Sequence, residues 1–210
     1  MPDGNIAYLD LEQFEDAKAV RGGALVVDPT TEPLEFRCTD AVRPTRLQRL
    51  LWGKRLDGHI AANLIGAPLI KSLSQKFSLV AVKNPDFLEL RTTIEIPVVL
   101  LTRDSGIDFE STGSAPSPKP SPKGGEGGGS VERPENSHQA EQDRVAETSL
   151  SNTSGRFEPI VLRCHPLHKD DLETVRTLLA PVFATHDVME PFERIATALQ
   201  MIHQEQQKGK

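Results

Sequence analysis

Ile6-Ala-Tyr-Leu-Asp10 and Gly22-Gly-Ala-Leu-Val-Val27 are the two stretches that decide the fold, because each predicts a strand buried in a sheet. Turn-forming residues follow at 28–33, and Leu34-Glu-Phe-Arg-Cys-Thr39 then alternates apolar and polar side chains. This order predicts a β-hairpin. The residues of its second strand that we expect to face the core are Leu34, Phe36 and Cys38.

The spacing of apolar residues predicts the remaining elements. Leu11 to Val20 has helical spacing, and a longer helical region begins near Pro44 and Thr45, where proline is tolerated and threonine can cap. Further strands are predicted at 79–82, 96–101 and 159–164, and further helices at 170–179 and 191–204. We therefore expect an α/β fold, a single domain with a mixed sheet of about five or six strands flanked by helices.

The domain is interrupted by a segment of different composition. Residues 111–155 contain no aromatic residue, alternate Pro with Ser and Lys at 116–123, and continue into a glycine run at 124–129. Such a segment buries too little apolar surface to become ordered. We predict an N-terminal α/β part at 1–110, a disordered linker at 111–155, and a C-terminal part at 156–210 that packs back on the first. The linker is interpreted as a tolerated insertion or as a docking motif around 116–123.

Charge and composition narrow the class of protein. The 210 residues include 24 Lys and Arg and 30 Asp and Glu, so the formal net charge is 24 − 30 = −6. No apolar run reaches the length of about 20 residues that a membrane helix needs, so we expect no membrane association. The two cysteines are far apart in sequence and predict reduced thiols, which is typical of a cytoplasmic protein.

An acidic group is the first candidate site. Asp10 ends the first predicted strand, Glu35 lies in the hairpin, and Asp86 follows the strand at 79–82. Ligands in α/β sheets bind beyond the carboxyl ends of strands, and carboxylates there can hold Mg²⁺ or Mn²⁺. The order strand, hairpin, helix, strand, with an acid on the first strand, resembles the ribonuclease H-like nuclease fold over about the first 105 residues. That resemblance implies a metal-dependent nuclease; the alternative is that these carboxylates are solvated groups at strand ends.

A basic stripe is the second candidate site. Arg43, Arg46 and Arg49 recur every three residues, and Trp52 and Arg55 follow. A helix brings such residues towards one face, where arginine can clamp phosphates and an aromatic ring can stack on a base. The stripe therefore indicates an acidic protein partner or nucleic acid. The alternative is a solvated helix face with Trp52 in the core.

The remaining motifs predict little chemistry. Cys164, His165 and His168 are weak zinc candidates, because no paired CxxC or HxxxH motif accompanies them, and we predict no metal site there. Gly22-Gly23 opens a strand, so it predicts a turn or close backbone packing and not a nucleotide-binding loop. Motifs of P-loop NTPases and α/β-hydrolases are absent from the sequence.

From these features the sequence predicts a non-enzymatic cytosolic protein that binds a protein partner as an adaptor or accessory subunit, without a cofactor. The binding residues of this interpretation are Arg43, Arg46, Arg49, Trp52 and Arg55. The alternative is a metal-dependent nuclease or phosphoryl-transfer enzyme of ribonuclease H-like topology, which would use Asp10, Glu35 and Asp86 with Mg²⁺ or Mn²⁺.

Overall fold

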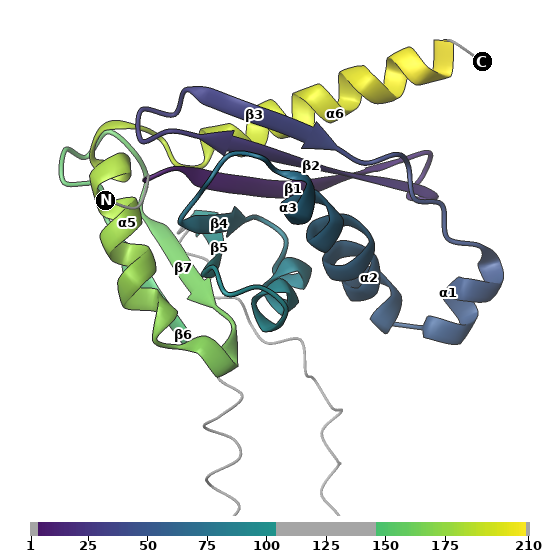
Figure 1. Ribbon diagram of the computed structural model, residues 1–210, viewed down its shortest axis with the longest axis horizontal. Coiled ribbons are helices and arrows are strands. Elements are labelled where there is room, and N and C mark those ends of the chain that lie inside the picture. Colours follow the sequence, from purple (N-terminus) through teal and green to yellow (C-terminus); the bar gives the residue numbers. More distant parts are fainter. Residues whose placement is uncertain (1–3, 104–145, 209–210) are drawn as a thin grey trace, which may run out of the picture.

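The computed structural model describes residues 4–103 and 146–208, which form a seven-stranded sheet with helices on both faces (Figure 1). The strands are β1 (Ile6–Phe14), β2 (Ala19–Val27), β3 (Pro33–Cys38), β4 (Leu79–Val82), β5 (Val98–Arg103), β6 (Ala146–Leu150) and β7 (Ile160–Cys164). Their order is β3-β2-β1-β4-β5-β7-β6. β4 is parallel to β1 and β5, and the other neighbours are antiparallel. The predicted α/β fold with a mixed sheet is confirmed, with seven strands in place of five or six.

The helices form a layer on each side of the sheet. They are α1 (Arg46–Trp52), α2 (Arg55–His59), the π-helix η1 (Ile60–Gly66), α3 (Ala67–Ser72), the 3₁₀-helix η2 (Pro85–Thr92), the short η3 (Pro166–His168), α5 (Asp171–Thr185) and α6 (Glu190–Lys208). Buried residues of α5 and α6 pack on one face, and those of α2, η1, α3 and η2 pack on the other. Each face of the sheet therefore has its own apolar core.

Two adjacent glycines let both layers approach the middle of β2. A Cβ atom on Gly22 would lie 2.0 Å from Cγ2 of Ile65 in η1. A Cβ atom on Gly23 would lie 2.9 Å from Cγ2 of Ile195 in α6. Both distances are shorter than a van der Waals contact, so the expectation that this glycine pair serves close packing holds at both positions.

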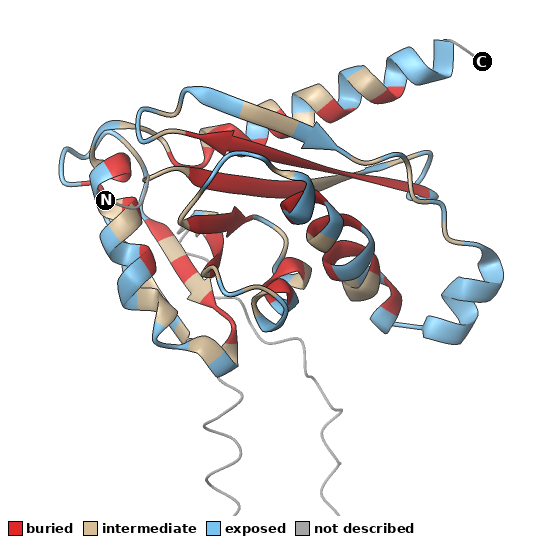
Figure 2. Cartoon of the chain, in the orientation of Figure 1, coloured by how far each residue is buried: buried red, intermediate tan, exposed pale blue. Residues whose placement is uncertain are grey.

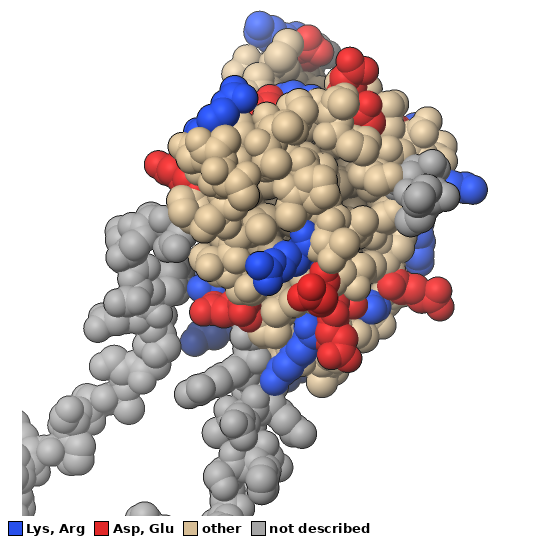
Figure 3. All heavy atoms as spheres, turned by 90° about the vertical axis from the view of Figure 1, so that its left-hand side faces the viewer, with Lys and Arg blue, Asp and Glu red and all other residues tan. Residues whose placement is uncertain are grey.

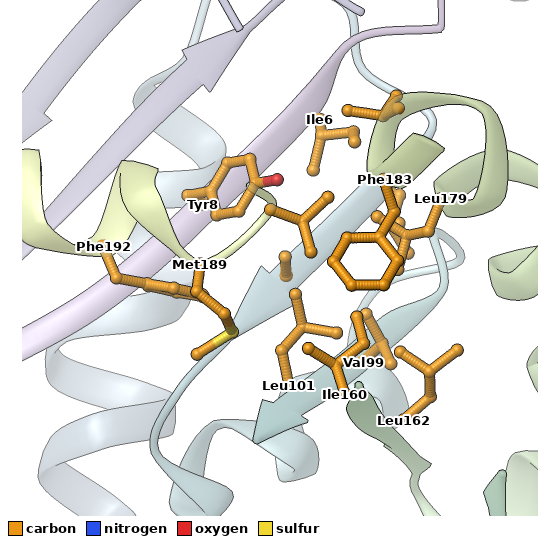
Figure 4. Packing of buried hydrophobic residues seen from close by; sticks show 14 of the residues in the cluster. Ile6, Tyr8, Val99, Leu101, Ile160, Leu162, Leu179, Phe183, Met189 and Phe192 are labelled. Carbon is orange, nitrogen blue, oxygen red and sulfur yellow. The ribbon is translucent and has the colours of Figure 1, made fainter. Parts of the chain in front are cut away.

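The core under α5 and α6 contains three of the largest fully buried side chains, Tyr8, Phe183 and Phe192. Tyr8 of β1 meets Phe192 of α6 edge to face, with ring centroids 5.1 Å apart. Figure 4 shows these rings with Phe183, Met189 and the aliphatic residues of β5 and β7 filling the space between sheet and helices. Burial of each such side chain contributes about 1.5 to 3 kcal/mol to folding.

The predicted helix at Leu11–Val20 is wrong. β1 runs on to Phe14, a tight turn follows at 15–18, and β2 begins at Ala19. Leu11 packs with the core under η1, whereas Phe14 packs with the core under α6, so residues at helical spacing serve opposite faces of a strand. Glu15, Asp16 and Ala17 all have positive φ angles, a conformation that ordinary propensity does not predict for these residues. Pairing with β2 outweighs the local helical pattern.

The predicted hairpin is confirmed, since β2 and β3 pair antiparallel. Its predicted facing holds for Phe36, which packs against the core, but Leu34 and Cys38 are exposed. β3 is the edge strand of the sheet, so fewer neighbours cover its residues.

Part of the predicted linker contains a strand. β6 at Ala146–Leu150 lies within the segment 111–155 and pairs with β7, with Leu150 buried in the core. The polar sequence of β6 hides this strand, because only one of its five residues is buried. The rest of the predicted linker up to residue 145 lies outside the described residues. Over the described ranges, no helix is long and apolar enough to cross a membrane.

Gly22→Ala tests the packing of β2. The added methyl group meets Ile65, so we expect the free energy of unfolding to fall by about 1 to 3 kcal/mol. Gly58→Ala in α2 is the control, because its added methyl group has only an ordinary contact, 3.8 Å from Asp86, and alanine favours the helix. Urea unfolding measures both. Equal stability of the Gly22 variant and the wild type would contradict the packing described here.

Candidate functional site

The carboxyl end of β4 lies beside the middle of β1, at one edge of the parallel part of the sheet. The two strands are parallel, and Leu9 pairs with Val82 in the register. Asp10 follows Leu9, and the segment from Lys83 into η2 follows Val82. Ligand sites of α/β proteins form at such an edge.

Asp10 points towards the α6 face of this edge. Its cross-strand partner is Gly23, which packs against α6, and directly paired residues share a face. The side chain is 4% exposed, and Oδ1 accepts a hydrogen bond of 2.9 Å from the Leu11 N–H. Burial raises the pKa of Asp10 from 3.8 to about 6, opposed by the Leu11 hydrogen bond and by the charge of Lys83.

Asp86 lies on the opposite face, in a cleft with Asp57. The cleft has a volume of about 120 Å³ and is lined by Leu11, Gln13, Val20, Asp57, Ile60, Asn84 and Asp86. Leu11 faces the core under η1, which places this cleft across the sheet from Asp10. Partial burial raises the pKa of Asp86, and the negative charge of Asp57 raises it further.

Glu35 makes contacts that fix the chain locally. Its carboxylate accepts hydrogen bonds from the N–H groups of Ser74 and Gln75, at 2.8 and 2.9 Å, and from Arg37. These donors hold the pKa of Glu35 below its usual range, the Gln75 N–H most strongly. The side chain therefore ties the edge strand β3 to the segment after α3.

The expected convergence of Asp10, Glu35 and Asp86 is not observed. Asp10 and Asp86 occupy opposite faces, and Glu35 is engaged elsewhere. Across the described residues, no group of three or more His, Cys, Asp and Glu side chains could hold a metal ion. The structure instead brings Asp57 to Asp86. The sequence does not indicate Asp57, because it lies in a helical stretch whose pattern is dominated by apolar and basic residues.

The oxygen donors of the Asp57–Asp86 cleft fit a hard divalent cation. Mg²⁺ is commonly held by one or two carboxylates, with water and substrate phosphates completing its shell. Asp57 and Asp86 supply two carboxylates, and Gln13 adds a side-chain amide to the same walls. Partial burial is the main cause of the raised pKa of Asp86 and the charge of Asp57 adds to it, and a bound cation would relieve that repulsion.

The basic stripe lies on an exposed arm, residues 43–55, that leads into α2 at one wall of this cleft. None of the residues of α1 is buried, as Figure 2 shows. The arm is held to the turn at 15–18: Arg43 binds Glu15 with hydrogen bonds of 3.1 and 2.6 Å, and Arg49 donates to the Ala17 carbonyl. Arg46 and Arg55 are exposed. Arg55 of the stripe and Asp57 of the cleft both belong to α2.

Apolar side chains share the arm with the arginines. Thr45 caps α1 as predicted, with Gln48 completing the capping box. Trp52 is not in the core; it stacks on His59 with centroids 4.2 Å apart and is 44% exposed. Leu47, Leu50 and Leu51 are more exposed still. The arm therefore presents basic, aliphatic and aromatic side chains to solvent.

The cysteine and histidine candidates do not form a site. Cys164 is buried in the core of β7, and burial raises the pKa of its thiol to about 12. Cys38 is exposed on β3, with four strands between β3 and β7 in the sheet. His165 lies 3.8 Å from Glu89, and its ring is close to that of His168. The described part of the chain gathers no metal-ligand group around these residues.

Charge is distributed differently on the face that carries α5. Figure 3 shows Lys and Arg side chains interspersed with Asp and Glu there, around a surface of uncharged residues. Ion pairs such as Arg103 with Asp187, at 2.9 Å, account for part of this mixture. That face offers no continuous basic surface comparable to the arm.

Solved structures share this fold, although no protein-family profile and no curated protein matches the sequence. Endonuclease V of Bacillus subtilis is similar with a TM-score of 0.53 and 12% identity, over 99% of this chain and 84% of that chain. Endonuclease V of Streptomyces avermitilis gives a TM-score of 0.53 and 15% identity, over 98% and 84%. Endonuclease V of Ciona intestinalis, in complex with a 24mer DNA containing an inosine followed by a ribo-adenosine, gives 0.52 and 11%, over 94% and 87%.

These likenesses correct the expected function. The sequence predicted a non-enzymatic adaptor, but the solved structures that share the fold over nearly the whole chain are endonucleases. The interpretation as an adaptor is therefore wrong, and the alternative of a nuclease is favoured. The chain has the α/β fold of these endonucleases.

The buried carboxyl of Asp10 predicts a characteristic pH dependence of stability. Its pKa is about 3.9 in the unfolded chain and about 6 in the folded protein, so its ionisation disfavours the folded state as pH rises from 4 through 6. Relative to Asp10→Asn, the wild type should lose about 2 to 3 kcal/mol of unfolding free energy over this range, measured by urea unfolding at each pH.

Asp28→Asn is the control for this pH dependence, and its sign is opposite. Hydrogen bonds from Thr30 and Glu32 lower the pKa of Asp28, so its contribution to stability is present at neutral pH and lost on acidification. Parallel pH profiles for wild type and Asp10→Asn would contradict the buried environment of Asp10.

Proposed function

We propose that this chain is a metal-dependent nuclease that holds a nucleic acid strand on the α1–α2 arm and cleaves it at the Asp57–Asp86 cleft. The observation that carries the proposal is this cleft, which lies beyond the carboxyl end of β4 in a fold shared with endonucleases. Its position beside the basic stripe supports the same conclusion. A cytoplasmic location stays a prediction from the sequence.

The proposed division of labour follows from the chemistry of each group. Asp57 and Asp86 would hold Mg²⁺ or Mn²⁺ through their carboxylate oxygens. When bound, the cation supplies positive charge that stabilises phosphate oxygens during the displacement of the leaving group. Asp10 and Glu35 have no ligand role in this proposal, because one is buried on the other face and the other is engaged by Ser74, Gln75 and Arg37.

The arm supplies strand binding without base specificity. Exposed Arg46 and Arg55 can contact phosphates, because neither is committed to the fold in the way that Arg43 and Arg49 are. Trp52 presents part of its ring to solvent, and base stacking on an aromatic side chain contributes about 1 to 3 kcal/mol. Single-stranded or locally opened nucleic acid is therefore the substrate class that the arm favours.

Asp57→Asn and Asp86→Asn test the catalytic assignment. We expect each to lower the cleavage rate by about 100-fold or more, because each removes a charged oxygen ligand, while oligonucleotide binding persists. Cleavage is followed on end-labelled DNA and RNA with Mg²⁺ or Mn²⁺, including a strand with one inosine, since the DNA in the Ciona complex contains inosine. Mg²⁺ binding to each variant is measured by calorimetry.

Glu89→Gln is the matched control, because Glu89 is exposed on η2 and does not line the cleft. It should cleave and bind Mg²⁺ as the wild type does. A wild-type protein that cleaves no substrate, or a doubly substituted Asp57→Asn, Asp86→Asn protein that cleaves normally, would overturn the proposal.

Arg46→Glu with Arg55→Glu tests the arm. Reversal of two charges should weaken oligonucleotide binding by about 10-fold or more and flatten its salt dependence, because fewer counterions are released on binding. Fluorescence anisotropy at several salt concentrations measures both effects. Arg176→Glu on α5 is the control for net charge, since it is exposed on the other layer. If all three reversals had the same small effect, the arm would not be the binding surface.

A further inference from the structure

Asn84 is the residue that joins β4 to η2 at the wall of the Asp57–Asp86 cleft. Its backbone is extended, with φ −97° and ψ 126°, and its carbonyl oxygen accepts a hydrogen bond of 3.2 Å from the Phe87 N–H. Its side-chain Oδ1 accepts a hydrogen bond of 2.9 Å from the Asp86 N–H and so caps η2. Two hydrogen bonds from N–H groups of η2 therefore fix its position.

The cap also fixes which way the amide group of Asn84 points. A carboxamide has one acceptor oxygen and one NH₂ group with two donors, at opposite ends of the same plane. Because Oδ1 is turned to the backbone of η2, the NH₂ group is turned away from it. Within the described residues, Nδ2 makes no hydrogen bond to the protein, and Asn84 is only partly buried. Two donors are thus available beside the two carboxylates.

A hydrogen-bond donor at this position offsets the repulsion between the carboxylates of the cleft and a phosphate group. Asp57 and Asp86 line the same cleft, and when ionised they repel a phosphodiester. A neutral N–H donor attracts a phosphate oxygen without binding to the carboxylates' cation, and it is held in place before the substrate arrives. Aspartate at this position would cap η2 equally well but would add a third negative charge.

We infer that the side-chain NH₂ of Asn84 donates a hydrogen bond to a non-bridging phosphate oxygen of the nucleic acid in the cleft. This inference rests on the proposed nuclease function and assigns a substrate-binding role to a residue whose visible role is that of a helix cap. It also explains why an amide, and not a carboxylate, follows β4 at this edge.

Three variants separate substrate binding from capping. Asn84→Ser keeps an oxygen acceptor for the Asp86 N–H and loses the NH₂ donors without a change of charge. Asn84→Asp keeps the acceptor and adds a negative charge. Gln200→Glu adds the same charge at an exposed position on α6 and serves as the control. Thermal unfolding of each variant reports whether the cap is retained.

Binding of a fluorescein-labelled single-stranded oligonucleotide is measured by anisotropy in EDTA, and cleavage is measured with Mg²⁺. We expect Asn84→Ser to bind about 5- to 10-fold more weakly, which is the loss of one hydrogen bond, with an unchanged melting temperature. Asn84→Asp should bind more weakly still, and Gln200→Glu should match the wild type. In cleavage, KM should rise more than kcat falls for Asn84→Ser.

The outcomes distinguish this inference from the function on which it rests. If the wild type binds and cleaves, and the Asp57 and Asp86 variants behave as proposed, but Asn84→Ser binds as the wild type does, only the inference about Asn84 is overturned. A fall in melting temperature that accounts for the lost binding of both Asn84 variants would also overturn it, since capping would then suffice. A wild type that neither binds nor cleaves would overturn both proposals.

Discussion

Close packing at the two glycines of β2 is the constraint on which the rest of the structure depends. Gly22 admits η1 to one face of the sheet, and Gly23 admits α6 to the other. Because successive residues of a strand point to opposite faces, one dipeptide fixes both helical layers. η1 in turn determines where α2 ends and η2 begins to pack, since η1 and η2 contact each other through Gly66 and Leu90. The cleft between α2 and η2 is thus a consequence of the packing of β2.

The same alternation separates the acids that the sequence appeared to unite. Asp10 pairs with Gly23 and therefore belongs to the α6 face, where burial disfavours its charge. Asp86 and Asp57 lie on the other face because they belong to η2 and α2, which are helices that cover that face. Both side chains line a small cleft, where a cation can compensate their charge. The alternation of side chains along β1 therefore explains why Asp10 lies apart from the other two acids.

Much of the fold could be predicted from the sequence, because its signals are local. Neighbouring residues alone predict several elements. The apolar run predicts β2, the alternation of apolar and polar residues predicts β3, and the apolar stripe predicts α6. The prediction of a helix at Leu11–Val20 was wrong because long-range pairing with β2 outweighs helical spacing. The turn in this segment also has positive φ angles at Glu15 to Ala17. The strand β6 was not predicted because a polar edge strand has too few apolar residues to show an alternating pattern. In the candidate site Asp86 was foreseen, but Asp57 depends on how α2 packs, which no local pattern encodes.

The net charge of −6 does not oppose the proposed binding of nucleic acid. Electrostatic interactions between exposed groups decay over a screening length of about 8 to 10 Å in physiological salt, so a strand responds to the charges that it approaches. On the arm these are Arg46 and Arg55, while Glu15 is already bound by Arg43. Two residues beyond Arg55 the sign reverses at Asp57. A phosphate backbone that follows the arginines is thereby brought near a pair of carboxylates whose repulsion a cation would relieve. Metal binding should therefore strengthen strand binding at the place where cleavage is proposed.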